Sequence, residues 1–456
     1  MSSLQQPFNL EKESITGASV ASTPRVLIAV PGSLSDRRSG PLIRFWALAR
    51  ALSETCDVTM AVTDPPADQR DGVRLVPSTR RHLLREVVKH DALISGCVPP
   101  YLLPIAAASK TAVVCDQYDP VDLEVETLPD SLVTRRTLAS QIAVARLHLR
   151  YADVVLCANG RQRERIEARL AAFGPRAHQP ELIELPFGLG AEPPPPADRR
   201  PLRERFGQIR DNDTVVLWWG VVWRWLDAET AVRAVAGLAD TRPDIKLVFA
   251  PARSLGAATE VTNATDRARQ LASDLGVLDR TVLFWEDWVP FDRRHELLAE
   301  ADIGLTLHGV TQEAHFSARV RYLDYLWASL PCILADGDET GTRFADAGFS
   351  TLVTPGDEAM VRAALIRLAD EPAALARARE AAPALAREYR WETLAKPLAQ
   401  TLARRAVERG MLAGEVSLPA DRMLHVAVYY ARRVVDKAVF ALERGSAAAD
   451  RALAGT

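Results

Sequence analysis

A cluster of charged residues lies in the stretch 316–338, FSARVRYLDYLWASLPCILADGD. The pattern predicts a helix with Ser317 as its N-cap, followed by a buried strand that ends in a turn. Arg319 and Arg321 fall in the predicted first turn, where the positive end of the helix dipole disfavours cations. Their presence indicates a bound anion, because free backbone N–H groups and arginine forks together suit a phosphate or diphosphate.

Asp324 lies one further turn along the predicted helix. At helical periodicity Ser317, Arg321 and Asp324 share one face, whereas Arg319 points elsewhere unless it precedes the first full turn. A carboxylate about two turns below an anion site is placed to accept hydrogen bonds from sugar hydroxyls, such as those of a nucleotide's ribose. The alternative is an ordinary helix with an Arg–Asp surface pair.

The elements that would position this helix alternate between short apolar runs and helical segments. The apolar runs predicted as strands are 25–30, 57–62, 73–76, 92–95, 111–115, 153–157 and 182–185, and then 214–219, 246–250, 281–285, 303–307 and 331–335. Such alternation predicts an α/β fold with parallel, doubly wound sheets. Ligands of such sheets bind outside the carboxyl ends of the strands, so we expect the site in a cleft between two domains.

The clearest boundary is the tract 192–196, whose four prolines predict a stiff, extended connector. The predicted organisation is a disordered tail (1–24), an N-terminal Rossmann-like domain (25–190), a Pro-rich linker (191–200), a second Rossmann-like domain (201–385) and C-terminal helices (386–456). The segment 418–454 carries apolar residues at helical spacing, interleaved with arginines. Packing against the N-terminal domain and contact with an anionic membrane surface both fit that pattern.

Composition excludes several classes of protein. The 456 residues carry a formal charge of −3, which gives no reason to expect nucleic-acid binding. No apolar run approaches the length of a membrane span, and the first 24 residues lack the apolar core of a signal peptide. The scattered cysteines predict reduced core thiols in a cytoplasmic protein; they are Cys56, Cys97, Cys115, Cys157 and Cys332.

Metal chemistry is not expected from the sequence. Two Asp-x-Asp triplets occur, Asp211–Asp213 and Asp336–Asp338, and a metal-dependent transferase uses such a triplet to hold Mn²⁺ or Mg²⁺. The first triplet precedes a predicted strand and fits a turn, and the second follows a strand. The histidines show no zinc-type spacing.

Seven stretches spread over both predicted domains have a familiar order and spacing. They are SGPLIRFWALARAL (39–52), CDQYDP (115–120), ADVVLCANGRQRER (152–165), ELPFG (184–188), LWWGVVWRWLDAETAVRA (217–234), ADIGLTLHGVTQEAHFSARVRYLDYLWASLP (301–331) and YRWETLA (389–395). Together they resemble the retaining glycosyltransferases of family 4, which have the two-domain GT-B architecture. The resemblance implies transfer of a hexose-type sugar from a nucleotide-diphosphate donor, held mainly by the second domain. The implied acceptor (a sugar, a lipid-linked molecule or a small molecule) is held mainly by the first domain. It further implies retention of anomeric configuration and no cofactor or essential metal.

The family's motif E-x7-E opens and crosses the helix described above, its first Glu contacting the donor sugar and its second the ribose. Asp324 falls at the second Glu, but Phe316 stands at the first, with Glu313 nearby as a substitute. The usual diphosphate clamp of an Arg and a Lys follows the first strand of the second domain. Here that loop begins at Gly220 and offers Arg224 but no Lys, so Arg319 and Arg321 are expected to supply charge.

In the first domain, Gly40 opens a helix whose N-terminus is expected to face the same diphosphate, with close backbone approach. Arg44, one turn further, is a candidate for an acceptor or donor phosphate, with structural pairing as the alternative. Asp116 and Asp119 close a strand at its carboxyl end and are catalytic candidates, for orienting the acceptor hydroxyl or for steadying positive charge at the anomeric carbon. The loop 284–290, FWEDWVP, matches the position where relatives hold the base, although its tryptophans also fit simple packing.

The leading hypothesis is therefore a retaining, nucleotide-sugar-dependent glycosyltransferase acting in glycan, polysaccharide or glycolipid biosynthesis. A non-hydrolysing sugar-nucleotide epimerase is an alternative on the same architecture, and it would need no acceptor. A catalytically silent sugar-nucleotide-binding protein is the third hypothesis, and the absence of the first Glu favours it.

Overall fold

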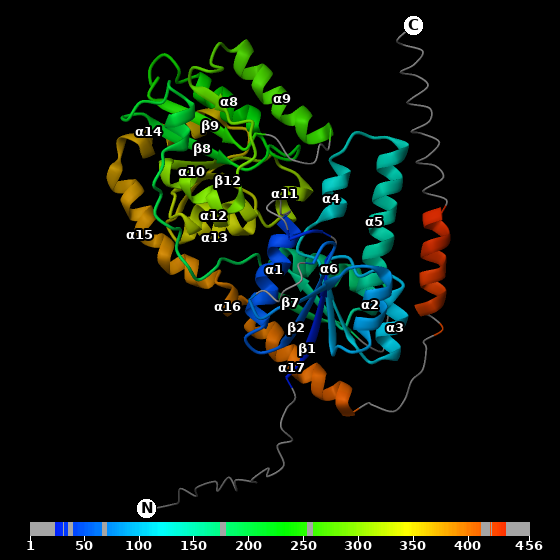
Figure 1. Ribbon diagram of the computed structural model, residues 1–456. Helices are drawn as coiled ribbons and strands as arrows, with labels where there is room; N and C mark the ends of the chain where they lie inside the picture. The colour runs from blue at the N-terminus through cyan, green and yellow to red at the C-terminus, as the bar shows by residue number, and fades with distance from the viewer. Residues whose placement is uncertain are drawn as a thin grey trace, which may run out of the picture.

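The computed structural model describes residues 23–30, 32–34, 40–65, 71–173, 179–252, 259–411, 420 and 422–434. It consists of two α/β domains, the N-terminal one in blue and cyan and the second in green and yellow in Figure 1. Each domain is built on one parallel sheet, which confirms the predicted fold class. The predicted tail lies outside the described residues apart from residues 23 and 24.

The first sheet has seven parallel strands in the order β3-β2-β1-β4-β5-β6-β7. The strands are β1 Arg25–Ala29, β2 Asp57–Val62, β3 Arg74–Pro77, β4 Ala92–Ser95, β5 Ala112–Asp116, β6 Val154–Cys157 and β7 Glu181–Glu184. The intervening helices are α1 Gly40–Leu52, α2 Arg80–Val87, α3 Leu102–Ala108, α4 Val121–Glu126, α5 Leu132–Tyr151 and α6 Gly160–Ala171. Alternate residues of β1 pack into two separate cores, so both faces of the sheet are covered.

The second sheet has six parallel strands in the order β10-β9-β8-β11-β12-β13. The strands are β8 Thr214–Trp219, β9 Ile245–Ala250, β10 Val282–Phe284, β11 Ile303–Thr306, β12 Cys332–Ala335 and β13 Ser350–Val353. Its helices are α7 Pro201–Arg205, α8 Ala228–Ala236, α9 Thr259–Asp274, η1 Phe291–Arg293, α10 Arg294–Glu300, α11 Gln312–Phe316, α12 Val320–Trp327, α13 Glu339–Asp346 and α14 Glu358–Asp370. β13 is absent from the predicted strands, because this half-buried edge strand begins with Ser and Thr and lacks a long apolar run.

The C-terminal helices return to the first domain (Figure 1). They are α15 Pro372–Glu388, α16 Trp391–Leu394 and α17 Lys396–Met411. Residues 191–200 form neither helix nor strand, as expected for the linker. A further helix spans 422–434 and buries Val426 in one of the cores of the first domain, so this part of 418–454 packs against that domain. The remainder, apart from residue 420, lies outside the described residues.

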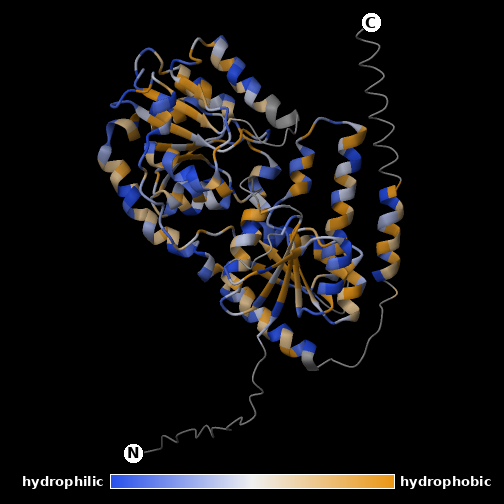
Figure 2. Cartoon of the chain, viewed as in Figure 1, coloured by the Kyte–Doolittle hydropathy of each residue, from blue (hydrophilic) through white to orange (hydrophobic). Residues whose placement is uncertain are grey.

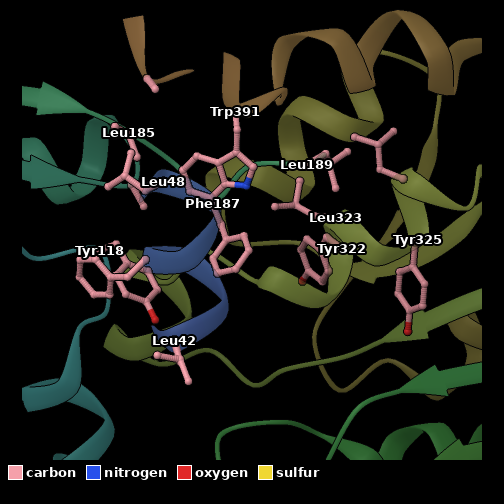
Figure 3. Packing of buried hydrophobic residues seen from close by; sticks show 14 of the residues in the cluster. Leu42, Leu48, Tyr118, Leu185, Phe187, Leu189, Tyr322, Leu323, Tyr325 and Trp391 are labelled. Atoms are coloured by element: carbon pink, nitrogen blue, oxygen red, sulfur yellow. The ribbon is translucent and has the colours of Figure 1, made fainter. Parts of the chain in front are cut away.

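The apolar strands form the centre of both domains, and polar residues cover the outer helices (Figure 2). One core runs continuously from the first domain to the second. Figure 3 shows Trp391 beside Phe187 of the first domain, with Leu323 of α12 in the same cluster. Gly188 permits this packing, because a Cβ there would lie 2.7 Å from the Trp391 ring. The end of the first domain and α16 therefore form a packed joint between the two sheets.

All five cysteines are free, and four of them are buried, whereas Cys97 is exposed. Within the described part of the chain, no helix has the length and apolarity that a membrane span requires.

Candidate functional site

A cleft of about 820 Å³ lies between the two domains. Gly40 and the outer side of α1 line it from the first domain. Opposite them lie the loop after β8, the segment before η1 and the face of α12; this second wall includes Gly220, Val221, Pro251, Trp288, Val289, Leu323 and Asp324. The cleft thus lies at the carboxyl ends of β8, β9 and β10, where parallel sheets bind their ligands.

The helix predicted to begin after Ser317 begins later. Thr311 caps α11, and Ser317 is the C-cap of that short helix, so the prediction of Ser317 as an N-cap was wrong. The backbone stays extended at Ser317 and Arg319, and α12 starts at Val320 with no side-chain cap. The segment therefore forms two short helices, and the N-cap is Thr311, six residues before the predicted Ser317.

Arg321 lies beneath the loop after β8. Its Nη2 donates to the carbonyl oxygen of Val221 at 2.8 Å, and a Cβ added at Gly220 would lie 3.6 Å from the guanidinium carbon. Gly220 has φ of +88°, a conformation that favours glycine. Among the described residues, Arg321 Nη1 is buried without a hydrogen-bond partner, and no carboxylate pairs with this side chain.

Burial lowers the pKa of Arg321 to about 10, so the group keeps its charge at neutral pH. A buried cation without a counter-ion is costly unless an anion completes the site. The contacts around Arg321 are therefore those of an anion site formed with the Gly220–Val221 backbone, which lines the cleft in front of this side chain.

Asp324 lines the cleft one turn beyond Arg321. Its carboxylate accepts hydrogen bonds from Trp219 Nε1 at 2.9 Å and from Arg294 Nε at 3.0 Å. The sequence analysis missed both partners. Trp219 ends β8, and its place at a carboxyl strand end was the available signal, whereas Arg294 lies thirty residues from Asp324 and gave none. The two donors fix the carboxylate's position while its remaining lone pairs can still accept hydrogen bonds.

Arg319 and Glu313 form a bidentate ion pair, with distances of 2.8 and 2.7 Å. Both residues are buried, at 8% and 1% exposure. Because each charge is matched by the other, the geometry argues against Arg319 as a diphosphate ligand and against Glu313 as a substitute for the first Glu. Phe316 lies against the first domain, where its carbonyl accepts from Gln162 and its ring lies under Arg165.

Arg44 and Asp116 form a second buried ion pair, at 2.7 and 3.1 Å, and both side chains are fully buried. Arg44 also donates to the carbonyl oxygens of Leu185 and Pro186. This pairing corrects the expectation that Arg44 contacts a phosphate, because its guanidinium nitrogens already donate hydrogen bonds to groups inside the domain. Asp116 in turn holds Arg44 and is not free to orient an acceptor hydroxyl.

Asp119 and Glu124 form a carboxyl pair at the carboxyl end of β5. Burial, together with the nearby Glu313, raises the pKa of Asp119 to about 6. Burial and the neighbouring Asp119 raise the pKa of Glu124 to about 9. Near neutral pH the two carboxyls therefore share one proton. Asp119 lines a separate cavity in the first domain.

The other predicted positions lie around the cleft. Gly40 begins α1 and lines the cleft, whereas Ser39 lies outside the described residues. Arg224 is partly buried in the turn that follows β8. Asp213 and Asp338 accept hydrogen bonds in turns and caps, and the described ranges contain no His, Cys, Asp and Glu cluster suited to a metal ion.

The two domains also contact each other beside the cleft, at the N-terminus of α6. The Glu339 carboxylate accepts from the backbone nitrogens of Gly160 and Arg161 at 3.3 and 3.1 Å. Arg161 donates to the carbonyl oxygen of Gly337 at 2.5 Å. A carboxylate at a helix N-terminus is a favourable contact, so these bonds hold the domains together on this side.

Comparison with solved structures places this architecture in the GT-B glycosyltransferase fold, which confirms the predicted resemblance in fold. Anabaena Alr3699/HepE in complex with UDP and glucose matches with a TM-score of 0.61 at 15% identity, covering 84% of this chain and 100% of that chain. WaaG, a glycosyltransferase involved in lipopolysaccharide biosynthesis, matches at 0.59 and 15%, covering 83% and 99%. An α,α-trehalose-phosphate synthase (UDP-forming) from Burkholderia vietnamiensis matches at 0.60 and 13%, covering 84% and 99%. No protein-family model and no curated protein sequence matches this chain.

Proposed function

We propose that this protein is a glycosyltransferase that moves a sugar from a nucleotide-diphosphate donor to an acceptor hydroxyl, with retention of configuration and without a metal ion. The observation that carries the proposal is Arg321, which has no ion-pair partner among the described residues and lies beneath the Gly220–Val221 loop of the cleft wall, with Asp324 on that wall one turn further along α12. Structures of HepE, which shares the fold, contain UDP or UDP-glucose.

In this proposal the diphosphate lies against Gly220 and Val221, within reach of Arg321. The N-terminus of α1 at Gly40 faces it from the other domain. As the bond between the sugar and the diphosphate breaks, the leaving group gains negative charge. A preorganised cation and backbone N–H groups stabilise that state more than the ground state. Fixed charge at this position thus accelerates transfer rather than only binding the donor.

The nucleoside lies deeper in the same cleft. Asp324 accepts hydrogen bonds from the ribose hydroxyls, and its partners Trp219 and Arg294 hold it in place. Trp288 and Val289 line the adjoining wall, where the base fits. Because Phe316 stands in place of the sugar-contacting Glu, binding of the donor sugar rests on other groups of the cleft.

A thermal-shift screen of UDP-, GDP- and dTDP-sugars tests the donor, since a ligand that binds the folded state raises the melting temperature. We expect one base to stabilise the protein, and donor consumption to require an added acceptor. The anomeric configuration of the product, read by NMR, tests retention, and activity in EDTA tests metal independence. A screen without any stabilising nucleotide would refute the proposal.

The same assay separates the two alternatives. A sugar-nucleotide epimerase would convert the donor without an acceptor. A silent binding protein would be stabilised by the donor but would show no turnover with any acceptor.

We further propose a role in cytoplasmic glycan, polysaccharide or glycolipid biosynthesis, with contact to an anionic membrane through the helix 422–434. This helix exposes Leu424, Val428 and Val434, and the exposed Arg432 and Arg433 follow on the same helix. Sedimentation with phosphatidylglycerol vesicles, but not with phosphatidylcholine vesicles, is the expected result. Equal recovery with both, or with neither, would contradict the membrane contact.

A further inference from the structure

A second hollow, of about 360 Å³, lies inside the first domain between α1, α4, α5 and α6. Its size falls within the usual range of small-molecule sites, roughly 300–1,000 Å³. Helix α1 separates it from the cleft, because Pro41 and Phe45 line this cavity while Gly40 and Ile43 line the cleft. A molecule in the cavity would therefore meet a donor in the cleft at the N-terminus of α1.

The walls of the cavity are largely apolar. They include Val30, Phe45, Val121, Val144, Ala145 and Ile166. Polar side chains of the lining also bond within the protein: the Gln162 amide donates to the backbone carbonyl oxygens of Tyr118 and Phe316, for example. An occupant with an apolar body is thus favoured over a fully hydrated sugar.

The charged residues of the lining balance one another. Arg165 and Arg169 both donate to the Asp122 carboxylate, which leaves one positive charge in excess. The Asp119–Glu124 pair, which shares one proton, supplies the matching negative charge. Asp116, the remaining carboxylate of the lining, is paired with Arg44. Because these charges balance, the wall offers no strong preference for an anion or a cation, and an uncharged occupant fits it best.

One buried polar atom of the lining has no partner in the described residues. His148 is fully buried, and its Nε2 lies 2.9 Å from the carbonyl oxygen of Val98. That contact requires the proton on Nε2, which makes Nδ1 a hydrogen-bond acceptor, and Nδ1 is buried without a donor. Burial lowers the pKa of His148, so the ring is neutral. An unmet acceptor on a residue that lines the cavity favours a ligand with a hydroxyl.

We propose that this cavity is the acceptor site, that it takes an uncharged acceptor with an apolar body, and that His148 selects the acceptor by accepting a hydrogen bond from its hydroxyl. The inference rests on the proposed glycosyl transfer and names its acceptor class. Asp119 lies on the side of the cavity nearest the second domain, close to Glu313 and Arg319. The hydroxyl that receives the sugar would lie at that side, next to α1.

Binding of 1-octanol and 2-naphthol to the full chain tests the cavity, with glycerol as the polar control. 1-Octanol has a chain as its apolar body and 2-naphthol a ring system. A higher melting temperature of the protein with either alcohol supports the inference. Val144→Trp fills the cavity and should abolish the rise in melting temperature that the alcohols cause. Ala143→Trp, at the preceding position of α5 and outside the cavity, should keep that rise. No shift with either alcohol, or an equal shift in Val144→Trp, would overturn the inference.

His148→Leu tests the selecting group separately. It should weaken 2-naphthol binding about tenfold while leaving naphthalene binding unchanged, because only the alcohol donates to Nδ1. Equal losses for both probes would assign His148 a packing role only. Nucleotide binding is measured in parallel, in the wild type and in Val144→Trp. If the alcohols bind and no nucleotide does, the proposed glycosyl transfer is refuted while the cavity remains a binding site. If nucleotides bind and the alcohols do not, only the proposed acceptor cavity is refuted.

Discussion

Replacing Arg321 by Ala should weaken binding of a nucleoside diphosphate far more than binding of its nucleoside. Arg321 is a buried cation whose Nη1 has no partner in the described part of the chain and whose Nη2 supports the Val221 carbonyl. A phosphate at this position would complete its hydrogen bonds. The nucleoside lacks that group and gains nothing from the charge.

The magnitude follows from the bonds that are lost. A hydrogen bond to a charged group contributes about 1.5–3 kcal/mol, and about 1.4 kcal/mol corresponds to a tenfold change in affinity. The diphosphate should therefore lose about ten- to hundredfold in affinity, and the nucleoside less than about threefold. Calorimetric titration measures both, using the nucleotide that gives the largest thermal shift. Arg321→Lys keeps the charge and should lose only part of the affinity.

A matched control removes an arginine of the same domain that lies away from the cleft. Arg280 precedes β10, at the amino end of the sheet, and it pairs with Asp240 on the surface. Arg280→Ala should leave both affinities unchanged. Equal losses for nucleoside and diphosphate in Arg321→Ala, with the melting temperature preserved, would refute the assignment of an anion site.

Other perturbations address the remaining groups. Asp324→Ala should weaken binding of nucleoside and nucleoside diphosphate alike, by about tenfold, because ribose hydrogen bonds are lost. For a 2′,3′-dideoxynucleotide, calorimetry should give the same affinity in the variant and the wild type, and a weaker affinity in the variant would contradict the ribose contact. Arg44→Met should lower the free energy of unfolding by about 3–5 kcal/mol, because it leaves the Asp116 carboxylate buried and unpaired. Urea unfolding measures this, and the double variant with Asp116→Leu should recover most of the loss. The raised pKa of Glu124, about 9, means that the folded state keeps a proton that the unfolded chain releases above its usual pKa, so stability falls as pH rises from 6 to 9. Urea unfolding of Glu124→Gln should show a weaker dependence, by up to about 1.4 kcal/mol per pH unit, and identical slopes would contradict the shared proton.

The fold could be predicted because its determinants are local and repeated. Each central strand is a short apolar run bounded by polar residues, and β2, β4 and β8 have the boundaries that the runs predicted. Fully buried parallel strands give this signal because both of their faces need apolar side chains. The edge strand β13 lacks it, since only Val353 is buried.

The site was predicted less well because side chains choose partners that the spacing does not reveal. Arg321 and Arg319 look alike in sequence, yet Glu313 neutralises only Arg319. Arg44 fits a phosphate contact by position, but the chain folds Asp116 against it from 72 residues away. Which cation stays available is decided by tertiary packing, and one sequence gives no measure of it.

The buried carboxylates of the first domain and of the domain boundary differ in what they can still do. Glu313 and Asp116 are each matched by an arginine, with all their strong bonds inside the protein. Asp119 is bonded to Glu124 instead, and the pair holds a single proton near neutral pH. It also lines the cavity beside α1, whose other face borders the cleft. If sugar transfer takes place where cavity and cleft meet, Asp119 is the carboxylate able to accept a hydrogen bond from the incoming hydroxyl, since its charge is not already held by a guanidinium.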